Sequence, residues 1–237
     1  MALPKLETPI YELELPSTGE KVKYRPFLVK EHKNLMIAME SKEDSQLRDS
    51  LASIISECTF NKIDPFEVSM FDIEFMFLRI RGKSVGEKIK LNVLCPDDNK
   101  TRVDVEINLE DIDVHMKAEH TNEVDVTDNI KIFMKYPALN DMIDIAAQQE
   151  TAQTAQVFTL IKRCVNEIHE GETVHNRVDM SEKDLEEFID SLTTETFEKL
   201  GNFFETMPKV MHVMKVKNPK TKKTGEVVIE GIQNFFG

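Results

Sequence analysis

The sequence predicts an α+β fold in which antiparallel β-hairpins pack against amphipathic helices. Three pairs of short segments alternate apolar and polar residues on either side of turn residues, a pattern typical of hairpins. Between these pairs, apolar residues recur every three or four positions, as in helices with one buried face. The 237 residues are 41% apolar and include only 8 Gly and 9 Pro, so an ordered core is expected.

The length fits one large or two small domains. We expect an N-terminal α+β domain over residues 1–117 and a C-terminal α+β domain over 118–237. Residues 117–128 contain no Pro- or Gly-rich linker, so a single domain is the alternative.

Residues 9–27 alternate apolar and polar around Ser17-Thr18-Gly19, which predicts the first hairpin. Helices are expected over 29–40 and from 44 onward. The second helix collects its apolar residues on one face: Leu47, Leu51, Ile54, Ile55 and Cys58. A free cysteine on such a face is more often a small buried residue than a reactive thiol, so we expect Cys58 to be buried.

The next segment, 70–80, is apolar nearly all round and is interrupted only by Asp72, Glu74 and Arg79. A helix of this kind must be covered on more than one side. We expect it to run through the middle of the domain; the alternative is that one face is reserved for a partner subunit.

A second hairpin is predicted from the alternation over 88–94 and 103–107, around a polar turn at 95–100. Short strand patterns follow at 112–116, 124–126 and 130–134. Together these segments indicate an antiparallel sheet.

The last third is predicted to be helical before it ends in strands. Phe158, Ile161, Val165 and Ile168 follow helical spacing, and Cys164 beside them is expected to be buried. Two further helices are expected to start at Ser181, which resembles the start of a capping box, and at Thr193-Thr194. After Pro208, the segments 210–216 and 227–229 predict a third hairpin around the turn NPKTKKTG.

Charge and composition exclude several classes of protein. With 30 basic and 43 acidic residues the net charge is −13, which argues against general nucleic-acid binding. No window approaches the ~20 apolar residues of a membrane span, and the start MALPKLETP lacks the apolar core of a signal peptide. Three cysteines, too few for a disulfide framework, fit a reducing cytoplasm. The partners that these observations leave possible are proteins or small molecules.

Residues 82–86 match the G-x-S-x-G pattern of a serine hydrolase, with Ser84 as the nucleophile. That motif needs a strand before the turn and a helix after it, and here the order is reversed. A helix that stops at a left-handed Gly82, with Gly86 easing entry to the strand, explains the same residues. A hydrolase is therefore the less favoured alternative, and we expect no catalytic residue.

No metal or cofactor site is predicted. The six histidines form no i, i+4 pair, and no Cys-x-x-Cys pair accompanies them. The turn Asp97-Asp98-Asn99 lacks the glycine and the distant glutamate of a calcium loop. A phosphate-binding loop at Gly82-Lys83-Ser84 fails because Phe77 stands where the pattern needs glycine.

Charge is segregated along the chain. From Asp97 to Asp128 there are eleven acidic and three basic residues, whereas 206–224 has six lysines and no acid. These are either solvated faces or surfaces that meet complementary partners, or one another in an oligomer. The candidate partner-binding residues are Asp97, Asp98 and Arg102 in the acidic hairpin, Arg79, Arg81, Lys83 and Glu87 at the helix–strand junction, and Lys215, Lys217, Lys220, Lys222 and Lys223 in the basic hairpin.

Three segments carry a family resemblance: PSTGEKVKYRPFLVKEHK (16–33), DIEFMFLRIRGKSVGEKI (72–89) and FFETMPKV (203–210). They resemble the baseplate hub proteins of T-even-like contractile-tailed phages, the group around the gene 26 product, with the hub-assembly product of gene 51 as a neighbour. Some relatives carry a second cysteine after the position of Cys95; here Asp97 and Asp98 follow, so no zinc site is carried over.

The resemblance implies a late structural or assembly protein of the central hub of the tail baseplate, acting by contacts with other hub and tail proteins. Its expected locations are the virion tail and, during assembly, the host cytoplasm. A transient assembly chaperone absent from the mature particle is the alternative, and a homo-oligomer stays open.

Overall fold

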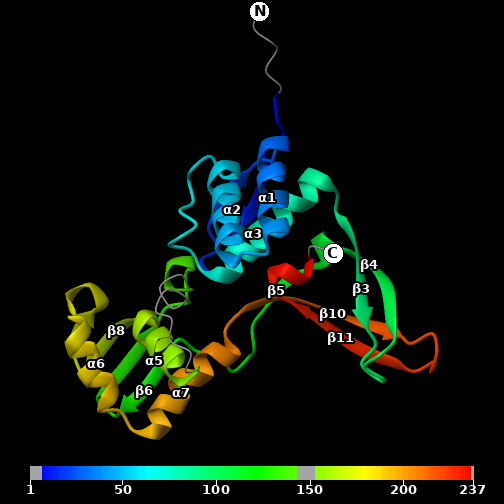
Figure 1. Cartoon of the computed structure of the whole chain (residues 1–237). Coiled ribbons are helices and arrows are strands. Elements are labelled where there is room, and N and C mark those ends of the chain that lie inside the picture. The colour runs from blue at the N-terminus through cyan, green and yellow to red at the C-terminus, as the bar shows by residue number, and fades with distance from the viewer. Residues whose placement is uncertain (1–6, 143–152, 236–237) are drawn as a thin grey trace, which may run out of the picture. The chain divides into compact units, whose positions relative to one another are not determined.

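The computed structural model describes residues 7–142 and 153–235. Short antiparallel sheets combine with helices, which confirms the α+β class (Figure 1). Contacts divide the chain into two compact units, Met1–His115 with Lys209–Gly237, and Met116–Pro208. The last hairpin thus packs with the N-terminal half, a long-range arrangement that local periodicity does not report. The two domains expected from the sequence, 1–117 and 118–237, stay a prediction.

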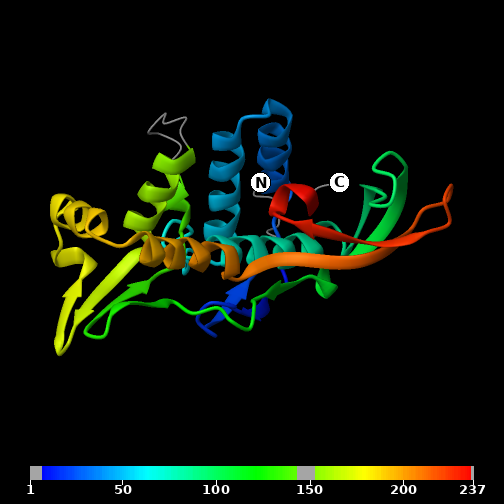
Figure 2. The same cartoon turned by 90° about the horizontal axis from the view of Figure 1, so that it is seen from below.

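The first unit begins with the expected hairpin and helices. Strands β1 (Tyr11–Glu14) and β2 (Lys21–Tyr24) pair antiparallel, and both bury alternate residues. Helices α1 (Val29–Ser41) and α2 (Asp44–Cys58) follow and lie side by side (Figures 1 and 2). Cys58 is fully buried at the end of α2, as its apolar face predicts.

Helix α3 (Met70–Val85) is the most deeply buried helix segment of the first unit, as its all-round apolar character predicts. The Ser69 hydroxyl caps its first turn by accepting a hydrogen bond from the Asp72 N–H. The prediction that Gly82 stops the helix is wrong. Gly82 stays helical, and Gly86 ends the helix because its φ of 116° is a conformation that glycine adopts readily.

Two long hairpins complete the first unit. Strands β3 (Lys88–Leu94) and β4 (Arg102–Asn108) form the second predicted hairpin. The short helix η1 (Leu109–Asp111) leads into β5 (Asp113–His115).

The third hairpin consists of β10 (Lys209–Lys217) and β11 (Thr224–Glu230), followed by the short helix η3 (Ile232–Phe235). β10 pairs with β5 as well, which gives a three-stranded sheet in the order β11-β10-β5. The two long hairpins lie side by side (Figures 1 and 2).

In the described part of the second unit, three of the helices pack on a four-stranded antiparallel sheet. The strands β6 (Glu123–Thr127), β7 (Ile130–Met134), β8 (Val165–Glu170) and β9 (Thr173–Asn176) lie in that order. The helices are α5 (Gln153–Cys164), α6 (Glu182–Asp190) and α7 (Thr194–Thr206), with the short η2 (Arg177–Asp179) before α6. An apolar core that includes Ile132, Leu185 and Phe203 joins sheet and helices.

The predicted start residues of α6 and α7 are confirmed. The hydroxyls of Ser181 and Thr193 accept from the N–H groups of Asp184 and Thr196, at 3.1 and 3.2 Å.

The helical reading of Val165 and Ile168 is wrong. α5 ends at the buried Cys164, and the next residue opens β8, which pairs with β7 and β9. Val165 and Ile168 are buried and three positions apart, a spacing that fits either one face of a helix or a strand with a bulge. The pairing of β7 with β8 has such an irregularity, because its register shifts between Phe133 and Met134. Strand pairing therefore overrides the local pattern.

Candidate interaction surfaces

The turns of the two long hairpins are joined by a polar group that we call the tip cluster: Asp97, Asp98, Asn218 and Thr221. The buried Asn218 donates from Nδ2 to Asp97 Oδ1 at 2.9 Å and to Asp98 Oδ2 at 3.0 Å. The Thr221 hydroxyl donates to the other oxygen of Asp97. Both acidic side chains thus hydrogen-bond within the chain, although Asp97 is exposed and Asp98 is half-buried.

Each turn is also fixed from within. Asp98 accepts from the hydroxyl of Thr101 at 2.6 Å and from its N–H at 2.9 Å, and these bonds hold the pKa of Asp98 well below its usual range. In the other turn, Asn218 Oδ1 accepts from the Lys220 N–H at 2.8 Å. The two loops therefore have defined shapes before any partner arrives.

Close backbone approach sets the spacing of the hairpins. A Cβ placed on Gly225 would lie 2.5 Å from Cγ of Pro96, closer than side-chain contacts allow. Only glycine fits there while the Pro96 ring stays in place.

The predicted basic hairpin presents five exposed lysines, which we call the basic tip: Lys215, Lys217, Lys220, Lys222 and Lys223. Within residues 7–142 and 153–235, none of them forms an ion pair. The acids of the neighbouring turn hydrogen-bond to Asn218 and Thr221, so the lysine ammonium groups of the basic tip stay available to a partner.

The predicted junction at the end of α3 is mostly engaged within the chain. Arg79 donates to the carbonyls of Leu109 and Ile112 at 2.6 and 2.9 Å and lies over the ring of Phe75. This arginine therefore holds η1 against α3.

Lys83 pairs with Glu87 at 2.6 Å and with Glu110 at 3.0 Å. Arg102, on the acidic hairpin, donates to the carbonyl of Asn92 at 2.8 Å. Arg81 differs from these residues, because its buried Nη1 has no hydrogen-bond partner among the described residues, and burial lowers its pKa.

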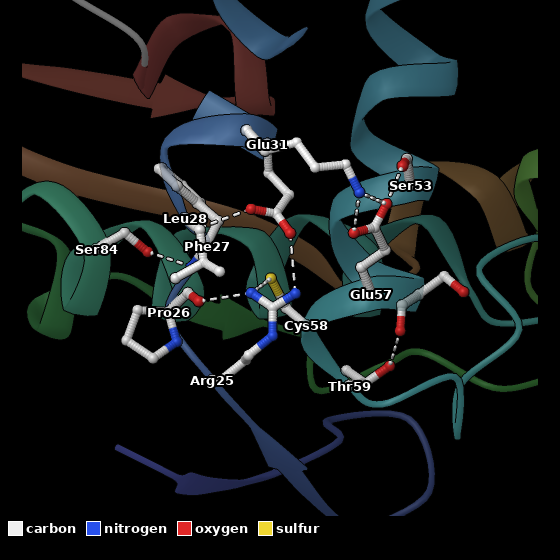
Figure 3. Close-up of polar contacts among 12 residues, drawn as sticks. Arg25, Pro26, Phe27, Leu28, Glu31, Ser53, Glu57, Cys58, Thr59 and Ser84 are labelled. Carbon is white, nitrogen blue, oxygen red and sulfur yellow. Dashed lines mark hydrogen bonds and ion pairs between the residues drawn. The ribbon is translucent and has the colours of Figure 1, made fainter. Parts of the chain in front are cut away.

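A buried ion pair that the sequence reading missed ties β2, α1 and α2 together. The Arg25 guanidinium lies between the carboxylate of Glu31, 2.9 Å away, and the sulfur of Cys58 (Figure 3). Glu31 also accepts from the Leu28 N–H at 2.7 Å at the start of α1. Burial raises the pKa of Glu31, but these hydrogen bonds outweigh it and lower the pKa to about 2.

Ser84 is a structural contact at this same place. Its hydroxyl accepts from the Phe27 N–H at 2.9 Å (Figure 3). It donates to the Ile80 carbonyl at 2.6 Å. Within the described parts of the chain, no imidazole hydrogen-bonds to it. Both contacts of this hydroxyl are to backbone groups, so it joins the end of α3 to the chain that leads into α1.

The three cysteines are buried and free. Burial raises the pKa of the Cys58 and Cys164 thiols to about 12, so both stay protonated at neutral pH.

Among the residues that the structure describes, no three His, Cys, Asp or Glu side chains are grouped to hold a metal ion. None of the described helices is long and apolar enough to cross a membrane.

The model of the T4 bacteriophage base plate protein family matches residues 8–237. The chain belongs to this family. No curated protein and no solved structure shows a significant match. As a base plate protein, the chain is a structural component of the phage tail in the virion, and its partners are other baseplate and tail proteins. The match confirms the baseplate part of the resemblance seen in the sequence; the assignment to the hub is argued below.

Proposed function

We propose that this base plate protein is a structural subunit of the central hub, related to the gene 26 product, and that it acts by contact rather than catalysis. Its basic tip docks on an acidic surface of another hub or tail protein. The observation that carries the proposal is the set of five exposed lysines without ion pairs among the described residues. They lie at the end of β10 and on the turn after it, which the buried Asn218 fixes.

Physical reasons favour this loop as a docking element. Opposed charges speed the encounter of two proteins and set their relative orientation. A loop already fixed by hydrogen bonds loses little conformational freedom when it binds. The tip cluster supplies that fixation, because Asp97 and Asp98 accept hydrogen bonds from Asn218.

The other predicted residues fall into two groups: those that form contacts within the chain, and those that are still proposed to contact a partner. Arg79, Lys83 and Glu87 shape the junction from which the acidic hairpin starts. Arg102, which is exposed, and Arg81, whose buried Nη1 has no hydrogen-bond partner among the described residues, remain proposed contact residues at its side.

The test is charge reversal of the basic tip. The variant Lys220→Glu, Lys222→Glu and Lys223→Glu should lose most of its association with hub intermediates in infected-cell lysate at low salt. The matched control reverses Lys23, Lys33 and Lys62, three exposed lysines of the same unit without ion pairs among the described residues. Equal association of the two variants would contradict the proposal.

A further inference from the structure

The second unit contains a surface hollow whose lining residues are not part of the basic tip. Its floor is apolar and is formed by Ile130, Ile168, Met180, Leu185 and Phe188, and its volume is about 400 Å³. That volume lies within the ~300–1,000 Å³ of ligand pockets. The hollow lies between α6 and the sheet strands β7 and β8.

The rim of the hollow is acidic. Glu170, Asp179 and Asp184 line it and are exposed, and His175 lies 3.6 Å from Glu170. The whole second unit, 116–208, has 19 acidic and 8 basic residues and therefore carries most of the net charge of −13. A ligand that enters this hollow meets negative charge from the rim and from the unit around it.

An open sheet edge adjoins the hollow. β9 is the last strand of the sheet, all four of its residues are exposed, and its His175 lines the hollow. The two-residue turn at 171–172 makes Glu170 and Thr173 a hydrogen-bonded pair. In the alternating antiparallel pattern, the N–H and C=O of Val174 then point to the open edge. Such an edge pairs readily with an added strand.

We propose that this hollow and the β9 edge together bind an extended segment of a partner protein. The segment places a large apolar side chain in the hollow, flanks it with lysine or arginine, and pairs its backbone with β9. The apolar floor, the acidic rim and the unpaired edge each select one of these three properties. The site is separate from the basic tip, so it stands or falls independently of the hub-docking proposal.

The probe is the blocked peptide KTVFVKT, titrated into the isotope-labelled full chain and followed by backbone amide chemical shifts. Shift changes are expected at 173–176 and 184–188. The peptides ETVFVET, with reversed charge, and KTVAVKT, without the aromatic ring, should each bind at least tenfold more weakly. Binding of either control peptide as tightly as KTVFVKT would overturn the proposal.

Rim variants separate the site from general attraction to an acidic protein. Glu170→Gln with Asp179→Asn should weaken binding of KTVFVKT at least fivefold. The matched control, Glu198→Gln with Glu205→Gln, changes the charge of the same unit equally on α7 and should leave binding unchanged. Equal effects of the two pairs would overturn the proposal.

Two further results would contradict it. Shift changes confined to other residues would place the peptide elsewhere. Concentration-dependent broadening at β9 without any peptide, relieved by reversing the charges of the basic tip, would make a second copy the occupant instead of a foreign segment.

Discussion

At the scale of single residues, the Arg25–Glu31 pair has the largest expected effect on stability. The two side chains are only 14% and 3% exposed, and they connect three elements of the first unit. Removing one charge of a buried pair leaves the other uncompensated, which typically costs ~3–5 kcal/mol. Little in the local sequence marks this pair, because a basic residue near a helix start is common on any surface.

Glu31→Gln should therefore lower the free energy of unfolding by about 3 kcal/mol at pH 7, as measured by chemical denaturation. Glu57→Gln, which breaks the exposed contact with Lys30, should cost much less. Because the folded pKa of Glu31 is lowered from 4.5 to about 2, its contribution is present above pH 4.5 and is lost as the pH falls toward 2. Equal losses in the two variants at pH 7 would refute the assignment.

Glu74 has the opposite pH dependence. Burial raises its pKa to about 7, although the Ile232 N–H donates to its carboxylate at 3.3 Å. The raised pKa means that the folded protein loses stability as the pH rises from 4.5 through 7. We expect Glu74→Gln to unfold at a higher denaturant concentration than the wild type at pH 8, and at a similar one near pH 4.5. Glu226→Gln, an exposed control, should show no such change.

At the scale of elements, the contact between the two long hairpins depends on small steric details. Gly225→Ala places a methyl group 2.5 Å from the Pro96 ring and should destabilise the first unit by roughly 1–3 kcal/mol. Adding Pro96→Ala removes the clashing Cγ and should restore most of the loss, which makes the pair a double-mutant cycle. Additive losses from the two substitutions would show that the hairpins do not meet at this point.

Elements with a strong pattern were predictable, and pairings between distant elements were not. The alternation in 88–94 and the capping residues Ser181 and Thr193 locate β3, α6 and α7 because each signal is local. The partners of Asn218 lie about 120 residues away in sequence, so the tip cluster could not be found from spacing. β9 went unpredicted because it is exposed on both faces and shows no alternation of burial.

The candidate site was predicted in part by charge. The basic tip follows directly from six lysines without an acid over 206–224. The use of Asp97 and Asp98 within the chain, and of Arg79 to hold η1, depends on where other elements lie. Sequence therefore identified which residues carry charge, and the structure shows which of those charges are already paired.

At the scale of the whole molecule, the two compact units differ in net charge. The second unit is strongly acidic, whereas the first is close to neutral and carries the basic tip. A subunit with surfaces of both signs can contact more than one neighbour in an assembly, each by a complementary patch. This is the property expected of a structural subunit in a hub built from several proteins.

The most direct test of the central claim is quantitative mass spectrometry of purified phage particles together with hub intermediates from infected cells. We predict a fixed, stoichiometric number of copies of this chain in both, and a mature particle depleted of it when the basic tip is reversed. Presence in the intermediates alone would contradict a permanent hub subunit and would identify the chain as an assembly chaperone.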